Sequence, residues 1–137
     1  MIVTKKKPVE EILNALGPAS KIFIIGCGEC ATTCKTGGEK EIIEMKAMLE
    51  ANGKTVTGWA IPKAPCVASQ TKLHFAKNKK MVDDSDAFLV LACGLGGQSV
   101  FENDRAKRPV YIGCDTIFGS ILDASRISPT FLGFLKC

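Results

Sequence analysis

The fold is decided by the stretch Lys21-Ile22-Phe23-Ile24-Ile25-Gly26-Cys27-Gly28, in which an apolar run leads directly into a cysteine between two glycines. Such a continuous apolar run is typical of a strand buried on both faces, as in a parallel sheet. Further strands are predicted at residues 55–61, 87–92 and 110–114, separated by helical segments. Because strands and helices alternate, we expect an α/β fold: one Rossmann/flavodoxin-like domain over residues 1–137, with a parallel sheet flanked by helices.

The helices expected around these strands span residues 9–16, 39–52, 69–82 and 98–106. The first carries Val9, Ile12 and Leu16 at helical spacing and is followed by Gly17, a typical helix-ending residue. The glycines between residues 94 and 97 predict a tight turn before the last helix. The sequence after residue 115 predicts no clear element.

The composition excludes several classes of protein. The chain has 137 residues and a formal net charge of +4, which requires neither nucleic acid nor an acidic membrane surface. The basic run Lys5-Lys6-Lys7 has no interleaved aromatic residues, so we expect no nucleic-acid binding. No segment approaches the roughly 18 apolar residues of a membrane span, and no signal peptide is recognisable. We therefore expect a cytoplasmic protein without membrane contact.

The seven cysteines are the most informative chemical feature. In a reducing compartment, clustered thiols are more often metal ligands or catalysts than disulfides. Cys27, Cys30 and Cys34 follow the first strand closely, and Cys66 and Cys93 each lie near the end of a later strand. Because the carboxyl ends of parallel strands meet at one edge of the sheet, these five thiols are expected to gather there.

Soft thiolate ligands favour an iron–sulfur cluster, which four cysteines usually hold, and we expect a 4Fe-4S cluster. Glycine permits close backbone approach, so N–H groups around Gly26, Gly28 and Gly94 are expected to donate hydrogen bonds to cluster sulfides. Cys27, Cys30 and Cys34 form the core of the expected ligand set, and Cys66 ranks slightly above Cys93 as the fourth ligand. The spacing leaves open which four of the five thiols bind. Zinc is the alternative metal, although its sites often show paired CxxC motifs and this chain has one.

Other signals are weaker. Cys114 is expected to pack as a small hydrophobic residue, and Cys137 to have no role. Residues 26–31 match the dinucleotide fingerprint G-x-G-x-x-A, but Ile61-Pro62-Lys63 supplies no acidic residue at the end of the second strand. His74 is expected to be a surface or packing residue, and no complete catalytic set can be assembled.

Residues 25–41 closely resemble the opening of the small, MetV-type iron–sulfur subunit of methylenetetrahydrofolate reductases. Residues 1–8 and 86–94 are similar to the same family, also described as a methylene-tetrahydrofolate reductase C-terminal domain. The resemblance implies a cluster-bearing electron-transfer subunit that docks on a flavin-containing, barrel-type catalytic subunit. That partner carries FMN and reduces methylenetetrahydrofolate in one-carbon metabolism, and further electron-transfer subunits are compatible with this arrangement.

The resemblance also implies that the five cysteines match family cysteine positions, and that longer members continue into a second cysteine-rich segment. Two other functions remain open from the residues alone. One is a structural adaptor domain stabilised by zinc or a redox-inert cluster. The other is a small redox enzyme that uses Cys27 and Cys30 as a dithiol.

Overall fold

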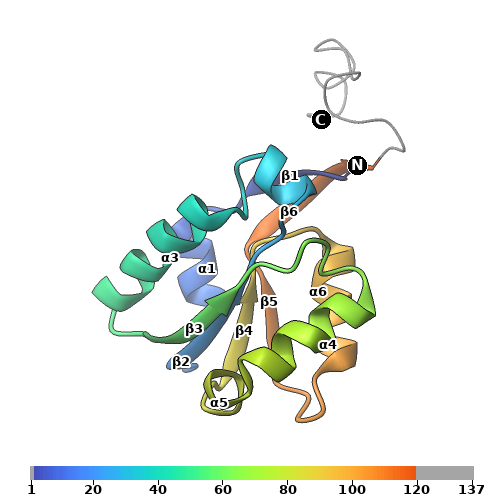
Figure 1. Cartoon of the computed structure of the whole chain (residues 1–137). Coiled ribbons are helices and arrows are strands. Elements are labelled where there is room, and N and C mark those ends of the chain that lie inside the picture. The colour runs from blue at the N-terminus through green and yellow to red at the C-terminus, as the bar shows by residue number, and fades with distance from the viewer. Residues whose placement is uncertain (1, 120–137) are drawn as a thin grey trace.

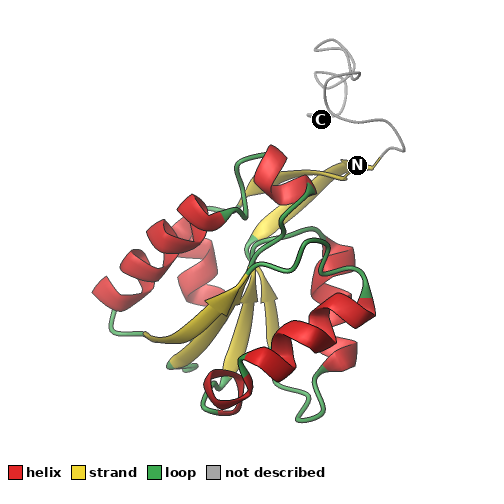
Figure 2. Ribbon diagram, viewed as in Figure 1, coloured by secondary structure: helices red, strands yellow, loops and turns green. Residues whose placement is uncertain are grey.

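The computed structural model describes residues 2–119, which form a four-stranded parallel sheet, covering helices and a separate two-stranded ribbon (Figures 1 and 2). The parallel strands are β2 (Lys21–Ile25), β3 (Thr55–Ala60), β4 (Ala87–Val90) and β5 (Val110–Ile112). Their order in space, β3-β2-β4-β5, places the earliest strand inside the sheet, as in flavodoxin-like folds. The predicted α/β fold with a parallel sheet flanked by helices is confirmed.

The helices are α1 (Val9–Leu16), α2 (Cys30–Thr33), α3 (Glu39–Ala51), α4 (Ala68–Lys77), α5 (Lys79–Asp83) and α6 (Gly94–Asn103). Helices α1 and α3 cover one face of the sheet, and α4, α5 and α6 cover the other (Figure 1). Ile22 and Ile24 of β2 belong to the first core, whereas Phe23 and Ile25 belong to the second. The apolar run is therefore continuous because both faces of β2 are buried. Within residues 2–119, no helix has both the length and the apolar character needed to cross a bilayer.

Two predicted elements differ from the structure. The helix expected over residues 69–82 is divided into α4 and α5 at Asn78, which leaves the helical conformation (φ −115°, ψ 26°) and donates its side-chain amide to the carbonyl of His74. The glycine turn expected at residues 94–97 is wrong, because these residues form the first turn of α6. There the helix packs so close to β5 that a side chain on Gly97 would overlap Ile112.

A two-stranded ribbon, which the sequence did not predict, joins the two ends of the described chain. Strand β1 (Ile2–Lys6) pairs antiparallel with β6 (Cys114–Gly119). The ribbon extends past the carboxyl edge of the sheet, next to α2 (Figure 1). The remaining residues of the C-terminal segment, including Cys137, lie outside the described part of the chain.

The segment between β2 and α3, residues 26–38, carries three cysteines and is called the cysteine loop below. It folds back over the carboxyl edge of the sheet, where the N–H of Cys27 donates to the carbonyl of Gly37 at 3.0 Å. Gly37 in turn lies directly against the carbonyl of Leu91, just beyond β4, and a side chain on Gly37 would overlap that oxygen. The gap between β2 and β4, where parallel sheets commonly bind ligands, is therefore filled by the chain itself.

Replacing Gly37 with alanine tests this contact. The new methyl group meets backbone atoms, which cannot move aside as a flexible side chain can, so we expect the free energy of unfolding to fall by about 3 kcal/mol. Gly94→Ala is the matched control, because no atom lies within 4 Å of the added carbon. The control is expected to change stability by less than about 1 kcal/mol. Urea unfolding measures both; a Gly37→Ala protein as stable as the wild type would contradict the contact.

Candidate metal centre

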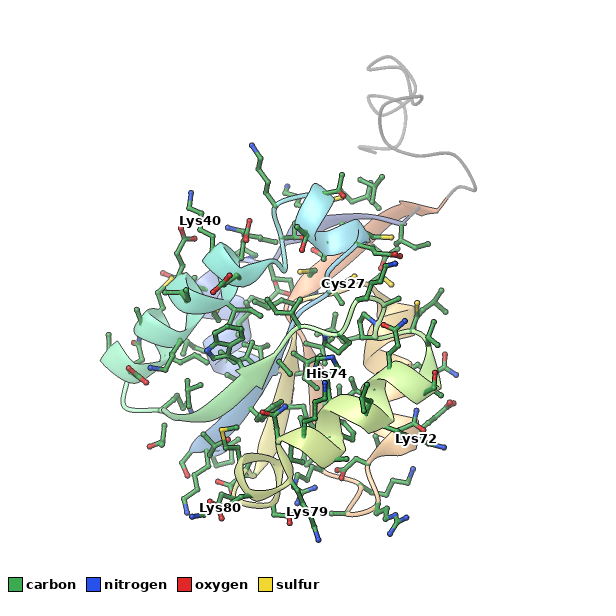
Figure 3. The ribbon with its side chains drawn as sticks, in the orientation of Figure 1. Cys27, Lys40, Lys72, His74, Lys79 and Lys80 are labelled. Carbon is green, nitrogen blue, oxygen red and sulfur yellow. The ribbon has the colours of Figure 1, made fainter. Side chains whose placement is uncertain are left out.

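The loops at the carboxyl edge of the sheet carry five cysteines. Cys27 follows β2, Cys30 begins α2 and Cys34 directly follows it, Cys66 follows β3, and Cys93 precedes α6. Figure 3 shows several sulfur atoms gathered in the region of Cys27 at this edge. Cys27 is buried, Cys66 is exposed, and the other three are half-buried, so the thiols extend from the core to the surface.

Cys66 has three other thiols as neighbours. Burial raises the pKa of the Cys66 thiol above its ordinary value of 9.0, and the negative charges of Cys93, Cys27 and Cys30 raise this pKa further. The Cys66 thiol therefore lies close enough to Cys93, Cys27 and Cys30 for their charges to disfavour its ionised form. A bound metal cation reverses the effect, because it stabilises the ionised form of every thiol that ligates it.

Cys34 lies on the side of the ribbon. Its S–H group donates to the carbonyl of Ile2 in β1, at 3.9 Å, and its charge contributes to the raised pKa of Cys114. Cys30 also touches β1, since its sulfur accepts the N–H of Ile2 at 3.5 Å. Thus Cys30 contacts the ribbon and also lies near Cys66. Cys34 contacts the ribbon as well, but the thiol that its charge influences is Cys114.

Hydroxyl groups hold the cysteine loop in shape. Thr32 donates to the carbonyl of Cys27 at 2.7 Å and so closes the loop on itself. Thr36 is buried, donates to the carbonyl of Ala31 at 3.2 Å, and lies 2.6 Å from the hydroxyl of Thr4 in β1. No pattern in the sequence around Thr4 predicts this threonine pair, because it depends on the pairing of β1 with the distant β6.

The three glycines predicted to contact a cofactor are already engaged. Their N–H groups donate to other atoms of the chain: Gly26 to Ala60 O at 2.9 Å, Gly28 to Pro62 O at 2.9 Å, and Gly94 to Thr116 Oγ1 at 3.2 Å. Donation to cluster sulfides would require these hydrogen bonds to be shared or broken. In this structure the glycines anchor the loops that carry the thiols, and their cofactor contact stays a prediction.

A single zinc ion and a 4Fe-4S cluster require different spacings of their ligands. Within residues 2–119, no three side chains of Cys, His, Asp or Glu are arranged to hold a single metal ion. Thiolates around one zinc ion, each about 2.3 Å from the metal, stand only about 3.8 Å apart in a tetrahedron. A 4Fe-4S cluster takes one thiolate at each iron, and its ligands stand farther apart.

The dinucleotide fingerprint at residues 26–31 does not lie in the structural context that it requires. Helix α2, which follows these glycines, has four residues and offers little helix dipole to a pyrophosphate. The N–H of Gly28 is bound to Pro62, and Gly37 fills the gap between β2 and β4. The residues after the fingerprint therefore form a thiol-bearing loop rather than a phosphate-binding helix.

Comparisons of the chain with protein-family models, curated proteins and solved structures found no match. The fold and the site thus define the class of protein: an α/β protein with a flavodoxin-like strand order and a thiol-rich carboxyl edge.

Cys114 differs from the other described cysteines. Its side chain is 2% exposed, and its S–H group donates to the carbonyl of Thr36 at 3.7 Å. Burial raises the pKa of the Cys114 thiol to about 11. Cys114 packs in the core with Ile12 and Leu89, as expected from the sequence.

This raised pKa predicts a stability that depends on pH. The unfolded chain loses the Cys114 proton near the ordinary pKa of 9.0, whereas the folded chain keeps it up to about 11. The stabilisation by the neutral thiol is therefore complete below pH 9 and is lost as the pH rises from 9 to 11. At pH 10 the loss is about 1.4 kcal/mol.

The measurement is the difference in free energy of unfolding between the wild type and Cys114→Ala, at pH 8 and at pH 10. Other thiols titrate in both proteins, so their contributions cancel in this difference. The advantage of the wild type should shrink at the higher pH. An unchanged difference would show that Cys114 ionises as readily in the folded protein as in the unfolded chain.

Proposed function

We propose that this chain is an iron–sulfur electron-transfer subunit whose cluster is held by Cys27, Cys30, Cys66 and Cys93. The observation that carries the proposal is that these thiols lie on the loops at one edge of the sheet, where Cys93, Cys27 and Cys30 are near enough to Cys66 for their charges to raise its pKa. Four cysteines complete the ligand set of a 4Fe-4S cluster, and such a cluster, when bound, accepts and gives up single electrons. In this proposal Cys34 does not bind the cluster, because its S–H group donates to the carbonyl of Ile2 in the ribbon.

The four proposed ligands come from three connections that follow strands of the sheet: the cysteine loop, the loop after β3 and the loop after β4. The cysteine loop is held to the sheet at Gly37, and the loop before Cys66 is held by the hydrogen bond from Gly28 to Pro62. Ligands positioned in this way lose little conformational freedom when a metal group binds. Cys27 is buried and Cys66 is exposed, so the ligand set reaches the surface on the Cys66 side, where electrons can be exchanged.

Exposed apolar side chains lie close in sequence to two of the proposed ligands, Cys66 and Cys93. Val67 adjoins Cys66 and is 43% exposed, and Leu95 lies two residues after Cys93 and is 57% exposed. Apolar side chains beside a redox centre are suited to a docking surface that excludes water. With the family resemblance, this supports docking on the FMN-containing catalytic subunit of a methylenetetrahydrofolate reductase in the cytoplasm, with electrons passing to or from its flavin.

The metal content tests the proposal first. Protein purified without oxygen is expected to contain about four irons and four acid-labile sulfides per chain, with a brown visible band that bleaches on reduction by dithionite. Iron and sulfide analysis and the spectrum before and after dithionite are the measurements. One zinc per chain and no colour would contradict electron transfer and support the structural adaptor instead.

Single substitutions test the ligand set. Alanine at Cys27, Cys30, Cys66 or Cys93 removes one of the four thiolates and is expected to abolish or severely reduce cluster incorporation. Cys34→Ala is the matched control from the same loop and should keep its iron, as should Cys114→Ala in the core. Iron retained in Cys66→Ala or Cys93→Ala, but lost in Cys34→Ala, would show that Cys34 is a ligand and that this assignment is wrong.

The docking surface has its own test. Leu95→Asp places a charge on the surface beside Cys93, so it should weaken binding to the flavin-containing subunit by at least about tenfold while leaving the iron content unchanged. Ile43→Asp is the control, because Ile43 is 52% exposed but lies on α3, which covers the other face of the sheet. Co-elution of the two subunits in size-exclusion chromatography reports the complex. Equal loss of binding in both variants would reject this surface.

A further inference from the structure

A cavity of about 470 Å³ lies far from the cysteine loop, between α4, α5 and the loop that joins α6 to β5. That loop and the end of α5 lead into the amino ends of β5 and β4, whereas the thiols lie at the carboxyl edge. Figure 3 shows Lys72 and Lys79, which line the cavity, well away from Cys27. Sites for small molecules commonly have volumes of about 300 to 1,000 Å³, so the cavity is of suitable size.

The floor of the cavity is apolar and aromatic. Phe75 and Val82 line it, and Val82 is buried. The ring of Phe75 stacks on the buried ring of Phe88, with 5.3 Å between centroids and 15° between planes. Phe75 itself is half-buried, so part of it remains accessible from the cavity side. A flat apolar group can pack against such a floor.

Arg108 is held in a fixed orientation at the cavity wall. Its Nη1 donates to Asp104 at 2.7 Å, its Nε donates to the carbonyl of Ser85 at 3.0 Å, and its guanidinium lies over the ring of Phe88. The remaining nitrogen, Nη2, has Asp83 at 3.7 Å, which is too long for a hydrogen bond. Within residues 2–119, this nitrogen makes no hydrogen bond and has only the longer ion pair with Asp83, so an anion in the cavity could take the place of that carboxylate.

The charges around the cavity favour an anion. Lys72, Lys79 and Arg105 line it without an ion pair to any carboxylate of residues 2–119. Of the two acidic residues of the lining, Asp104 accepts a hydrogen bond from Arg108 Nη1, and Asp83 makes a longer ion pair with Nη2 at 3.7 Å. Four cationic and two anionic side chains therefore surround the cavity, leaving a net positive charge of two.

We propose that this cavity binds a small anion with a flat aromatic body. The ring packs on Phe75, and the anionic group lies near Arg108 Nη2 with Lys72 or Arg105 beside it. The site is independent of the metal centre, and its occupation requires neither a cluster nor a partner subunit. An aromatic carboxylate is the simplest molecule with this chemistry.

The first test uses 2-naphthoate as the probe and 2-naphthamide, which has the same rings but no charge, as the control. Each is titrated into the ¹⁵N-labelled full chain, and amide shifts are followed by NMR. We expect 2-naphthoate to produce saturable shifts at residues around Phe75, Val82 and Arg105, and 2-naphthamide to bind at least about tenfold more weakly. Equal binding of both probes, or no saturable shift with 2-naphthoate, would overturn the proposal.

Charge reversal provides the second test. The double variant Lys72→Glu, Arg105→Glu should weaken 2-naphthoate binding by at least about tenfold, because two favourable charges become repulsive. The double variant Lys40→Glu, Lys46→Glu makes the same change in net charge on α3, across the sheet, and should bind as the wild type does. Equal weakening in both variants would mean that only the overall charge attracts the probe, and the cavity would be rejected as the site.

Discussion

The contact of Gly37 with the carbonyl of Leu91 is the constraint on which the thiol-bearing edge of this protein depends. Two backbone segments can approach this closely only where a side chain is missing. The contact holds the end of the cysteine loop against the end of β4, and the hydrogen bond from Cys27 to Gly37 holds its beginning. Because both ends are fixed on the sheet, the loop has a defined path although it contains a single turn of helix.

The ribbon supports the side of the cysteine loop that faces away from the sheet. A helix of four residues is not stable in isolation, because the cost of its nucleation exceeds what its few hydrogen bonds return. Helix α2 is therefore maintained by its surroundings: Ala31 is buried against the sheet side, and Ile2 of β1 contacts the sulfurs of Cys30 and Cys34 on the other side. The Thr4–Thr36 pair links β1 to the same loop. Residues from both ends of the described chain thus shape the candidate metal centre.

The sequence predicts local elements well and long-range arrangement less well. The runs at Ile22–Ile25 and Ala87–Val90 are recognisable because burial on both faces demands uninterrupted apolar residues. The sequence does not predict strand β1, because its partner β6 lies more than a hundred residues away and its half-polar residues show no regular alternation. The glycines that begin α6 predict a turn, since local preference does not reveal the close packing of Gly97 on Ile112.

The candidate site likewise combines features that local sequence predicts with features that depend on long-range contacts. Strand ends indicate which edge of the sheet carries the thiols, because that follows from parallel topology alone. They do not indicate which thiols face each other, because that depends on the path of the cysteine loop. Cys34 shows the difference: its spacing from Cys30 suggests a common ligand set, yet the ribbon that covers α2 places a carbonyl of β1 beside its sulfur. No local pattern contains that neighbour.

The two ends of the sheet are electrostatically distinct and largely independent. Strand β2 has five residues, which corresponds to about 17 Å between the carboxyl edge and the amino edge. At an effective dielectric constant of about 20, two unit charges at that separation interact by about 1 kcal/mol, and salt screens them further. Ionisation of the thiols therefore has little influence on the basic cavity, and an anion in the cavity has little influence on the thiols. The sheet thus separates the thiol-bearing carboxyl edge from the basic cavity at the amino edge. The charge state of each region is set by the side chains within it.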